Sequence, residues 1–307
     1  MIDSLRQVQV VGALARLAGH GGWARVLAGQ PLETELDRAD ARLLVAAGVL
    51  RERDGGRLEP VDLHPWYDDP QTLACGIVAE LRRALMHATD CDDLIPADPD
   101  EIVAMGIASR SVASILADAV LPMLPVTRDR LDDGTARFLD VGVGTGAIAQ
   151  VLCEEFPGIE AVGLDVSVDA LAIAKERLAG SRVGERIELR QQSVTELHEE
   201  CAYDLAWMPQ IFLCRTDLEQ GLDRVHTALK PGCWLVMPVA TGASDCTELE
   251  RAAVEHEALV RGGGPMSVEL AGDLLRQAGF TEVRDMLGVA QSLVMARKSP
   301  VSAVSAA

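Results

Sequence analysis

Two acidic residues and three glycines stand where the ends of sheet strands could bind a ligand. The run ARFLDVGVGTGAIAQVL (136–152) predicts a strand, a turn and a helix, and its turn region holds Asp140, Gly142, Gly144 and Gly146. Glycine allows a ligand to approach the backbone without a Cβ in the way, and it suits the tight reversal from strand to helix. The run also satisfies the G-x-G-x-x-A pattern of nicotinamide-dependent dehydrogenases, and it is compatible with a purely structural turn.

A second acid follows on the next expected strand. AVGLDVS (161–167) predicts an apolar strand that ends in Asp165, 19 residues after Gly146. In a doubly wound sheet the ends of adjacent strands open into one crevice, where a carboxylate can accept hydrogen bonds from both hydroxyls of a ribose. Alternatively, Asp165 caps the following helix, but Ser167 is better suited to that role. We therefore expect Asp165 to bind a ribose.

These residues need a sheet that places strand ends side by side. From about residue 135 the sequence alternates strand and helix patterns, which predicts a parallel α/β sheet. We expect strands near 137–141, 160–165, 186–190, 203–208, 233–239, 282–287 and 291–297, and helices near 147–156, 168–180, 217–229 and 267–278. Pro231 and Gly232 predict a tight turn before the fifth strand. The expected fold class is α/β, with a doubly wound, mostly parallel, seven-stranded sheet.

The residues before this sheet predict a separate, mostly helical region. Apolar residues recur at helical spacing over 10–19, 33–48, 71–86 and 101–124. The stretch 49–61 has a hairpin signal at Asp54-Gly55-Gly56. Two helices followed by a hairpin are typical of a winged helix. We expect one domain over 1–130, a second over 131–299, and a flexible tail over 300–307.

The composition argues against several classes of function. The chain has 307 residues, and its net charge of −19, from 28 Lys and Arg against 47 Asp and Glu, disfavours nucleic-acid binding. Aromatic residues make up only 3%, which leaves few platforms on which bases could stack. Seven scattered cysteines without a CxxC pair indicate reduced thiols, and we expect no metal site.

Signals for secretion and membrane insertion are not expected either. The start MIDSLRQVQVV lacks a basic region followed by a cleavage site. No apolar run is expected to approach the roughly 18 residues that cross a bilayer. We therefore expect a cytoplasmic protein that binds neither a membrane nor a nucleic acid.

The order of the motifs resembles one enzyme family. DVGVGTG, GLDVS, YDLAWMPQ (203–210) and LKPGCWLVMPV (229–239) follow one another as in the class I, seven-stranded S-adenosylmethionine-dependent methyltransferases. The resemblance covers roughly residues 105–297 and extends more loosely to the N-terminal region. Small-molecule methyltransferases often carry a winged-helix-like dimerisation domain there. The resemblance thus implies an S-adenosylmethionine cofactor, a small-molecule acceptor, and a homodimer formed through the N-terminal domain.

The resemblance also assigns roles at the amino-acid and ribose ends of the cofactor. The three glycines of the turn, Gly142, Gly144 and Gly146, would line the amino-acid end. Asp140 would organise that end through a hydrogen bond or a water molecule. Asp165 would hold the ribose hydroxyls.

Further residues would contact the adenine and the sulfonium. By the same resemblance, Val166 would pack on the adenine face, and Ser193 and Val194 would contact its edge. Ser193 departs from the family pattern, in which an Asp is common at that position. Met208, Pro209 and Gln210 would lie beside the sulfonium, although a strand-end Met208 could equally belong to the core.

The sequence does not identify a catalytic base. Many related O-methyltransferases carry a His after the fourth strand, but the corresponding stretch IFLCRTDLE (211–219) has Leu213 at that position. Either the acceptor is already a good nucleophile or a base comes from elsewhere. His256 could lie in a substrate lid or on a solvated helix face, and Arg110 could lie near the cofactor carboxylate or on a plain packing helix.

Two alternatives to methyl transfer stay open. A protein with this fold could bind the cofactor for regulation or for a reaction other than methyl transfer. An NAD(P)-dependent oxidoreductase is less favoured, because the chain has only Tyr67 and Tyr203 and neither has Y-x-x-x-K spacing.

Overall fold

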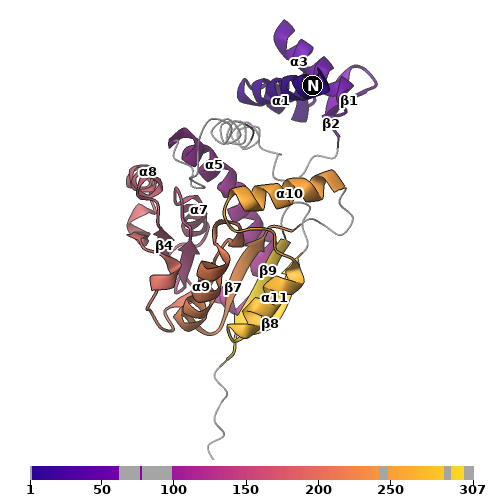
Figure 1. Ribbon diagram of the computed structural model, residues 1–307. Coiled ribbons are helices and arrows are strands. Elements are labelled where there is room, and N and C mark those ends of the chain that lie inside the picture. The colour runs from indigo at the N-terminus through magenta and orange to yellow at the C-terminus, as the bar shows by residue number, and fades with distance from the viewer. Residues whose placement is uncertain (1, 62–76, 78–98, 242–247, 287–291, 301–307) are drawn as a thin grey trace, which may run out of the picture. The chain divides into compact units, whose positions relative to one another are not determined.

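The protein is described by a computed structural model that covers residues 2–61, 77, 99–241, 248–286 and 292–300 (Figure 1). Its contacts divide the chain into two units, the first ending at Val112 and the second beginning at Ala113. This division falls earlier in the chain than the boundary expected at residue 130. The expected helix at 71–86 and the expected tail at 300–307 lie almost entirely outside the described residues.

The first unit begins with helices and a hairpin: α1 (Ile2–Gly19), α2 (Gly22–Leu27), α3 (Glu35–Ala46), β1 (Leu50–Arg53) and β2 (Arg57–Pro60). A capping box starts α3, since the Thr34 hydroxyl accepts from the Asp37 N–H at 3.0 Å and the Asp37 carboxylate accepts from the Thr34 N–H at 3.3 Å. Leu17, Trp23 and Leu44 form the core of these elements. The predicted hairpin is confirmed, and α2 is an additional helix where the sequence indicated only a break.

An irregular helical segment leads into the second unit: α5 (Pro99–Ile115), a π-helical turn (Leu116–Val120), a 3-10 turn (Leu121–Met123) and α6 (Pro125–Asp132). The segment predicted as a single helix over 101–124 is thus helical almost throughout, but it is α-helical only to Ile115, and Pro122, which has no N–H to donate, lies in its final 3-10 turn. Among the described residues, Met105–Met123 is long and apolar enough to span a membrane, which corrects the expectation that no run approached that length. About a third of this segment is buried, and most of its buried residues, including Leu116 and Leu121, lie in its later part within the second unit.

Seven strands form the sheet of the second unit. In chain order they are β3 (Arg137–Val141), β4 (Glu160–Asp165), β5 (Ile187–Gln191), β6 (Tyr203–Trp207), β7 (Leu229–Val239), β8 (Phe280–Met286) and β9 (Ser292–Lys298). Across the sheet the order is β5-β4-β3-β6-β7-β9-β8. Six strands run in the same direction, and β9 runs opposite to them. The predicted doubly wound, mostly parallel α/β sheet is confirmed. The chain reverses direction across the sheet between β3 and β6, where such folds bind ligands.

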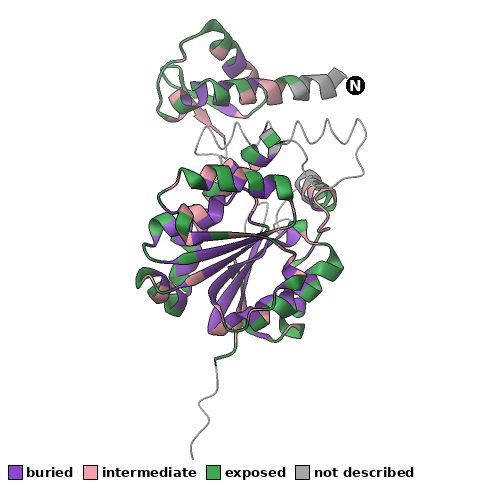
Figure 2. Ribbon diagram, turned by 90° about the vertical axis from the view of Figure 1, so that its left-hand side faces the viewer, coloured by how far each residue is buried: buried purple, intermediate pink, exposed green. Residues whose placement is uncertain are grey.

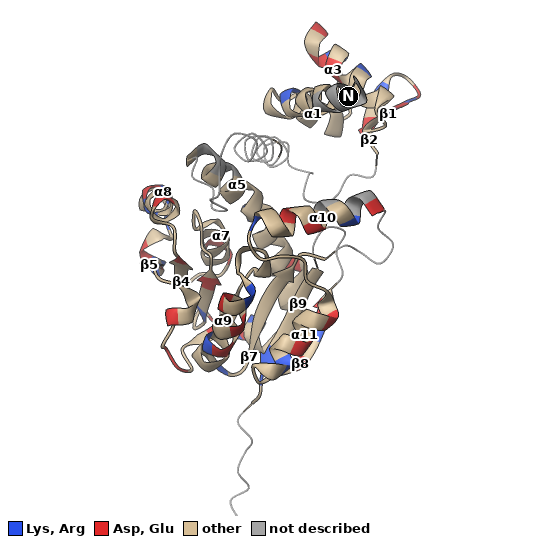
Figure 3. Cartoon of the chain, in the orientation of Figure 1, with Lys and Arg blue, Asp and Glu red and all other residues tan. Residues whose placement is uncertain are grey.

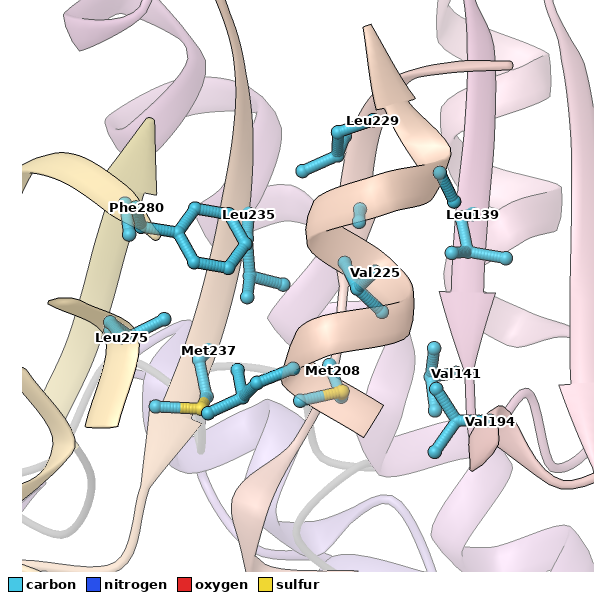
Figure 4. Close-up of a cluster of buried hydrophobic side chains, with 14 of the residues drawn as sticks. Leu139, Val141, Val194, Met208, Val225, Leu229, Leu235, Met237, Leu275 and Phe280 are labelled. Carbon is cyan, nitrogen blue, oxygen red and sulfur yellow. The ribbon is translucent and has the colours of Figure 1, made fainter. Parts of the chain in front are cut away.

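Helices cover both faces of this sheet, so that its central strands are buried, whereas the edge strands β5 and β8 are partly exposed (Figure 2). These helices include α7 (Ala147–Glu155), α8 (Val168–Ala179), α9 (Arg215–Ala228) and α11 (Val268–Gln277), while α10 (Glu248–Val260) packs beyond the carboxyl ends of β6 and β7. Apolar side chains such as Leu139 of β3, Val225 of α9 and Met237 of β7 meet in the core on one face (Figure 4). The charged residues are found mainly on the helices and loops (Figure 3).

β7 begins earlier than the sequence predicts. The Pro231-Gly232 turn expected before the fifth strand is instead part of the strand Leu229–Val239. Pairing between β6 and β7 shifts register at this point, so the extra residues form a bulge in which Gly232 has a φ of 81°. The bulge brings the Lys230 ammonium to 2.7 Å from the Asp204 carboxylate.

Candidate active site

The turn after β3 lies at the edge of the sheet where β3, β4 and β6 end. The Gly142 N–H donates to the carbonyl of Leu164 at 2.8 Å, and the Gly144 N–H donates to Asp165 Oδ2 at 2.8 Å. Pro209, which follows β6, has its Cγ 3.9 Å from the point that a Cβ on Gly142 would occupy. The structure therefore brings the glycine turn, Asp165 and Pro209 together, as the sequence predicts.

All three glycines of the turn have left-handed backbone conformations. Their φ angles are 70° at Gly142, 54° at Gly144 and 75° at Gly146, a region that residues with a side chain rarely adopt. A Cβ on Gly142 or Gly144 would have no described neighbour closer than 3.9 Å, whereas a Cβ on Gly146 would lie 3.1 Å from Leu178 Cδ1. The first two glycines thus leave the backbone open to a ligand, and the third allows α8 to pack against the turn.

Asp140 is a buried carboxylate without a partner. Only 1% of the residue is exposed, and neither oxygen accepts a hydrogen bond from the described residues. Burial raises the pKa of Asp140 to about 7, while the nearby Ala149 N–H at the start of α7 lowers it in part and the Asp165 carboxylate raises it. An unsatisfied buried carboxylate costs free energy, and a cationic or hydrogen-bond-donating ligand would remove that cost.

Asp165 is held in place by two backbone groups. Its Oδ2 accepts from the Gly144 N–H and its Oδ1 accepts from the Ser167 N–H, both at 2.8 Å. Each oxygen keeps a further lone pair, so the carboxylate can still accept hydrogen bonds from a diol. The Ser167 hydroxyl caps α8 by accepting from the Ala170 N–H at 3.2 Å, which leaves Asp165 free of that role. Val166 beside it is 57% exposed and offers an apolar surface to a flat ring.

Three of the predicted binding residues are engaged elsewhere through their side chains. Ser193 caps the 3-10 turn η5 (Val194–Glu196). The side chains of Val194 and Met208 are buried in the core beneath α9, where both pack over Gly221 (Figure 4). Only the backbone of Val194 and Met208 is therefore available for the expected cofactor contacts.

Residues that the sequence analysis did not single out also shape the turn. A Cβ on Gly163 in β4 would lie 2.5 Å from Val143 Cγ2, so Val143 fills the space that this glycine leaves. Arg177 of α8 donates to the Thr145 carbonyl at 3.1 Å and to the Thr145 hydroxyl at 2.6 Å. A glycine inside a strand pattern is a known signal of close approach and could have pointed to Gly163.

The helix α10 packs over the ends of β6 and β7 (Figure 1). Its Val254 and Ala258 contact Ile211, which follows β6, and Ala240, which follows β7. His256 is exposed and lies on the opposite face of α10, because it is two residues from both Val254 and Ala258. The solvated-face interpretation of His256 is thus favoured over a role as a base. At the expected position of the base, Leu213 packs against the core.

A second buried carboxylate lies at the other end of the sheet. Asp204, near the start of β6, is also 1% exposed. It accepts hydrogen bonds from Arg130 Nη1 at 2.6 Å, from Lys230 Nζ at 2.7 Å and from the Arg137 N–H at 2.9 Å. This saturated arrangement ties α6 and β7 to the sheet and indicates a structural role.

Comparison with known proteins places this edge in context. Residues 139–235 match the family described as "Methyltransferase domain". Over 267 residues the chain is 27% identical to the release factor glutamine methyltransferase of Cereibacter sphaeroides, a match that covers 75% of this chain and 89% of that protein.

Solved methyltransferases share the fold along nearly the whole chain. Human N-acetylserotonin methyltransferase, in complex with S-adenosylmethionine, is similar with a TM-score of 0.64 and 17% identity, covering 97% of this chain and 96% of that one. An O-methyltransferase family protein from Burkholderia thailandensis has a TM-score of 0.62 and 14% identity, and 98% of each chain is covered. At these identities the likeness shows a common fold.

The described residues fit S-adenosylmethionine. The cofactor carries an ammonium and a sulfonium cation, and Asp140 is a buried carboxylate that lacks a partner among the described residues. Its ribose diol matches the spare lone pairs of Asp165, and Gly142 and Gly144 leave room for it along the turn. Together with the match of residues 139–235 to the methyltransferase domain, this chemistry supports the enzyme class and cofactor expected from the sequence: the chain is an S-adenosylmethionine-dependent methyltransferase whose seven-stranded sheet has the class I fold.

Proposed function

We propose that this enzyme methylates a small-molecule acceptor, mainly by holding it in line with the methyl group of the cofactor. S-Adenosylmethionine supplies, when bound, a methyl group activated by the positive sulfur. The observation that carries the proposal is the character of the chain after β6. Met208 packs in the core, Pro209 has no N–H, and the Gln210 amide is bonded within the protein. Positioning of reactants can by itself contribute several kcal/mol.

The surroundings of this edge support a nucleophilic acceptor. Among the described residues that pack here, we identify no histidine placed to remove a proton, because His256 faces outward on α10. We therefore propose an acidic hydroxyl, a thiol, an amine or an enolate as the reacting group. Phe212 supports an apolar acceptor, since the residue is 43% exposed and the Arg261 guanidinium lies over its ring at 5.3 Å. The O-methyltransferases among the structural relatives favour oxygen.

A second candidate acceptor is the side-chain amide of a protein glutamine. It is favoured by the likeness to the release factor glutamine methyltransferase. An amide nitrogen is a weak nucleophile, and its N–H groups need acceptors to orient it. The described residues directly after β6 offer backbone carbonyls but no polar side chain that is not already bonded, so we place this acceptor second.

Transfer of a labelled methyl group tests the proposal. The purified protein would be incubated with methyl-labelled S-adenosylmethionine and, separately, with catechol, 1-naphthol, thiophenol, tryptamine or a glutamine-containing peptide. We expect label on at least one of the small molecules. Label on the peptide alone would replace the proposal by the second candidate. Saturable cofactor binding without label on any compound would favour the alternative that the protein binds the cofactor for another purpose.

We further propose that the N-terminal unit is a winged-helix-like dimerisation domain and that the enzyme is a cytoplasmic homodimer. The succession of α1, α2 and α3 with the hairpin β1–β2 supports the winged helix. Leu36 on α3 is 54% exposed and supports a contact with a second copy. Sedimentation velocity tests the assembly, and a monomer at high protein concentration would refute the dimer.

A further inference from the structure

Gln210 connects three segments just after the carboxyl end of β6, where we propose that the acceptor lies. It follows Met208 and Pro209 at the start of the 3-10 turn η6 (Gln210–Phe212), and it is fully buried. Its Nε2 donates to the carbonyls of Gly263 at 2.9 Å and Gly264 at 3.0 Å. Its Oε1 accepts from the Ala240 N–H at 3.4 Å. One side chain thus uses both amide donors and its carbonyl to join β6, β7 and the loop after α10.

The loop after α10 also contacts the backbone of the residue that follows Gln210. The Gly263 N–H donates to the Ile211 carbonyl at 2.9 Å. A Cβ on Gly263 would lie 2.5 Å from the carbonyl carbon and oxygen of Ile211, so no larger residue fits without displacing the loop. The loop also closes on its own helix, since the Gly264 N–H donates to the Ala258 carbonyl at 2.8 Å.

The chain segment between β7 and α11 leaves the sheet and returns to it at the same residue. It leaves the sheet at Ala240 and comes back where the Met266 N–H donates to the Ala240 carbonyl at 3.2 Å. Between these points α10 packs on Ile211 and Ala240 through Val254 and Ala258. This apolar contact involves four residues, and the Arg261 guanidinium lies over the Phe212 ring at 5.3 Å, so the three hydrogen bonds of Gln210 are the buried polar part of the fit between α10 and the end of β6.

We propose that Gln210 is a positioning residue for the methyl acceptor: it fixes α10 and its loop as a wall of the acceptor site, and it leaves the cofactor half of the site untouched. The inference rests on the proposed function, because it assumes an acceptor that lies beside the end of β6. The cofactor half depends on the turn after β3 and on Asp165, and the printed contacts of Gln210 reach neither.

Two variants disrupt the contact between Gln210 and the loop after α10, one by changing Gln210 and the other by changing the loop. Gln210→Met keeps the length of the side chain but leaves the carbonyls of Gly263 and Gly264 without their donor. Gly263→Ala keeps Gln210 and displaces the loop by steric contact with Ile211, without backbone strain from a left-handed φ. The matched controls are Gln277→Met, at an exposed position of α11, and Gly180→Ala, whose Cβ would have only the Arg177 carbonyl nearby, at 4.0 Å.

Three measurements decide the proposal. Hydrogen exchange of residues 248–260 should become about tenfold faster in both variants, the factor that one buried hydrogen bond amounts to, while exchange in β4 stays unchanged. S-Adenosylhomocysteine affinity and the KM for the cofactor should stay within about twofold of wild type. The KM for the small molecule that wild type methylates fastest in the panel above should rise about tenfold or more.

The opposite results overturn it. Equal increases of both KM values would make Gln210 a support of the whole site, and unchanged exchange in α10 would show that Gln210 does not hold the wall. Failure of the proposed function is recognised separately, because wild type would then methylate no small molecule. In that case the exchange of 248–260 and the KM for the glutamine-containing peptide decide the role of Gln210.

Discussion

Asp140 and Asp204 lie on neighbouring strands, are equally buried, and differ completely in their partners. Asp204, at the amino end of β6, is surrounded by Arg130, Lys230 and the Arg137 N–H. Asp140, toward the carboxyl end of β3, has no hydrogen-bond partner among the described residues. The protein stabilises one carboxylate with its own groups and leaves the other for a ligand. Burial alone therefore does not distinguish a structural acid from a functional one, whereas the missing partner does.

The largest effect is expected from the pH dependence of Asp140. Burial raises its pKa from 3.8 to about 7, so the folded protein holds a proton in this range that the unfolded chain releases. The corresponding stability is fully present below about pH 4 and is lost as the pH rises to about 7, a loss on the order of 4 kcal/mol. Asp140→Asn should remove this dependence and abolish tight cofactor binding. Urea unfolding of wild type and Asp140→Asn at about pH 5 and about pH 8 measures the free energy of unfolding at each pH. If both proteins changed by the same amount between the two pH values, the unpartnered state of Asp140 would be contradicted.

Asp204→Ala should destabilise the fold and leave cofactor binding unchanged. Removing this carboxylate leaves the Arg137 N–H without its acceptor and the charges of Arg130 and Lys230 without their partner. Both side chains are about one-third exposed and can regain water, so we expect a loss of about 3 kcal/mol, the lower end for a broken buried pair. Denaturant unfolding measures this loss. Weaker cofactor binding by the remaining folded protein would contradict the separation of the two carboxylates.

Asp165→Ala tests the cofactor side of the comparison. The loss of charge-assisted hydrogen bonds should weaken S-adenosylmethionine binding by about 1.5–3 kcal/mol, or roughly 10- to 150-fold in Kd. Titration calorimetry measures this, with Asp169→Ala in the first turn of α8 as the control acid. Unchanged affinity would remove Asp165 from the site.

The smallest effect is expected from Ser167→Ala, two residues away. Its hydroxyl caps α8, so its removal should cost about 1 kcal/mol of stability and leave cofactor affinity unchanged. Thermal unfolding and calorimetry on the same samples check both parts. A loss of affinity comparable to that of Asp165→Ala would mean that the cap orients the carboxylate.

Local sequence patterns predicted well where Asp140, the glycine turn and Asp165 lie in the fold. Asp140, the glycine turn and Asp165 lie at strand ends next to turns, and the period of the strands and the glycines mark such ends in the sequence. The side-chain direction of Met208 and Val194 was not predicted, because a strand-end residue can face the ligand or the core, and here α9 covers it. The bulge of β7 was not predicted either, because Pro231-Gly232 is compatible with both a turn and a bulge.

The acceptor half was less accessible to sequence reasoning. Gln210 meets Gly263 across more than fifty residues of chain, and α10 stands over the sheet edge through that pairing. No local period contains such a contact. The sequence could indicate that a segment follows the fifth strand, but which face of α10 turns inward, and hence where His256 points, depends on tertiary packing.

The glycine in the middle of β4 has a consequence for how this protein could be altered. Val143 fills the space left by the missing side chain of Gly163, so the distance of the turn after β3 from β4 is set by a residue of the neighbouring strand. A methyl group added at Gly163 would lift the turn without touching any ligand. Adjustments of cofactor affinity are thus open to a residue that no inspection of ligand contacts would select.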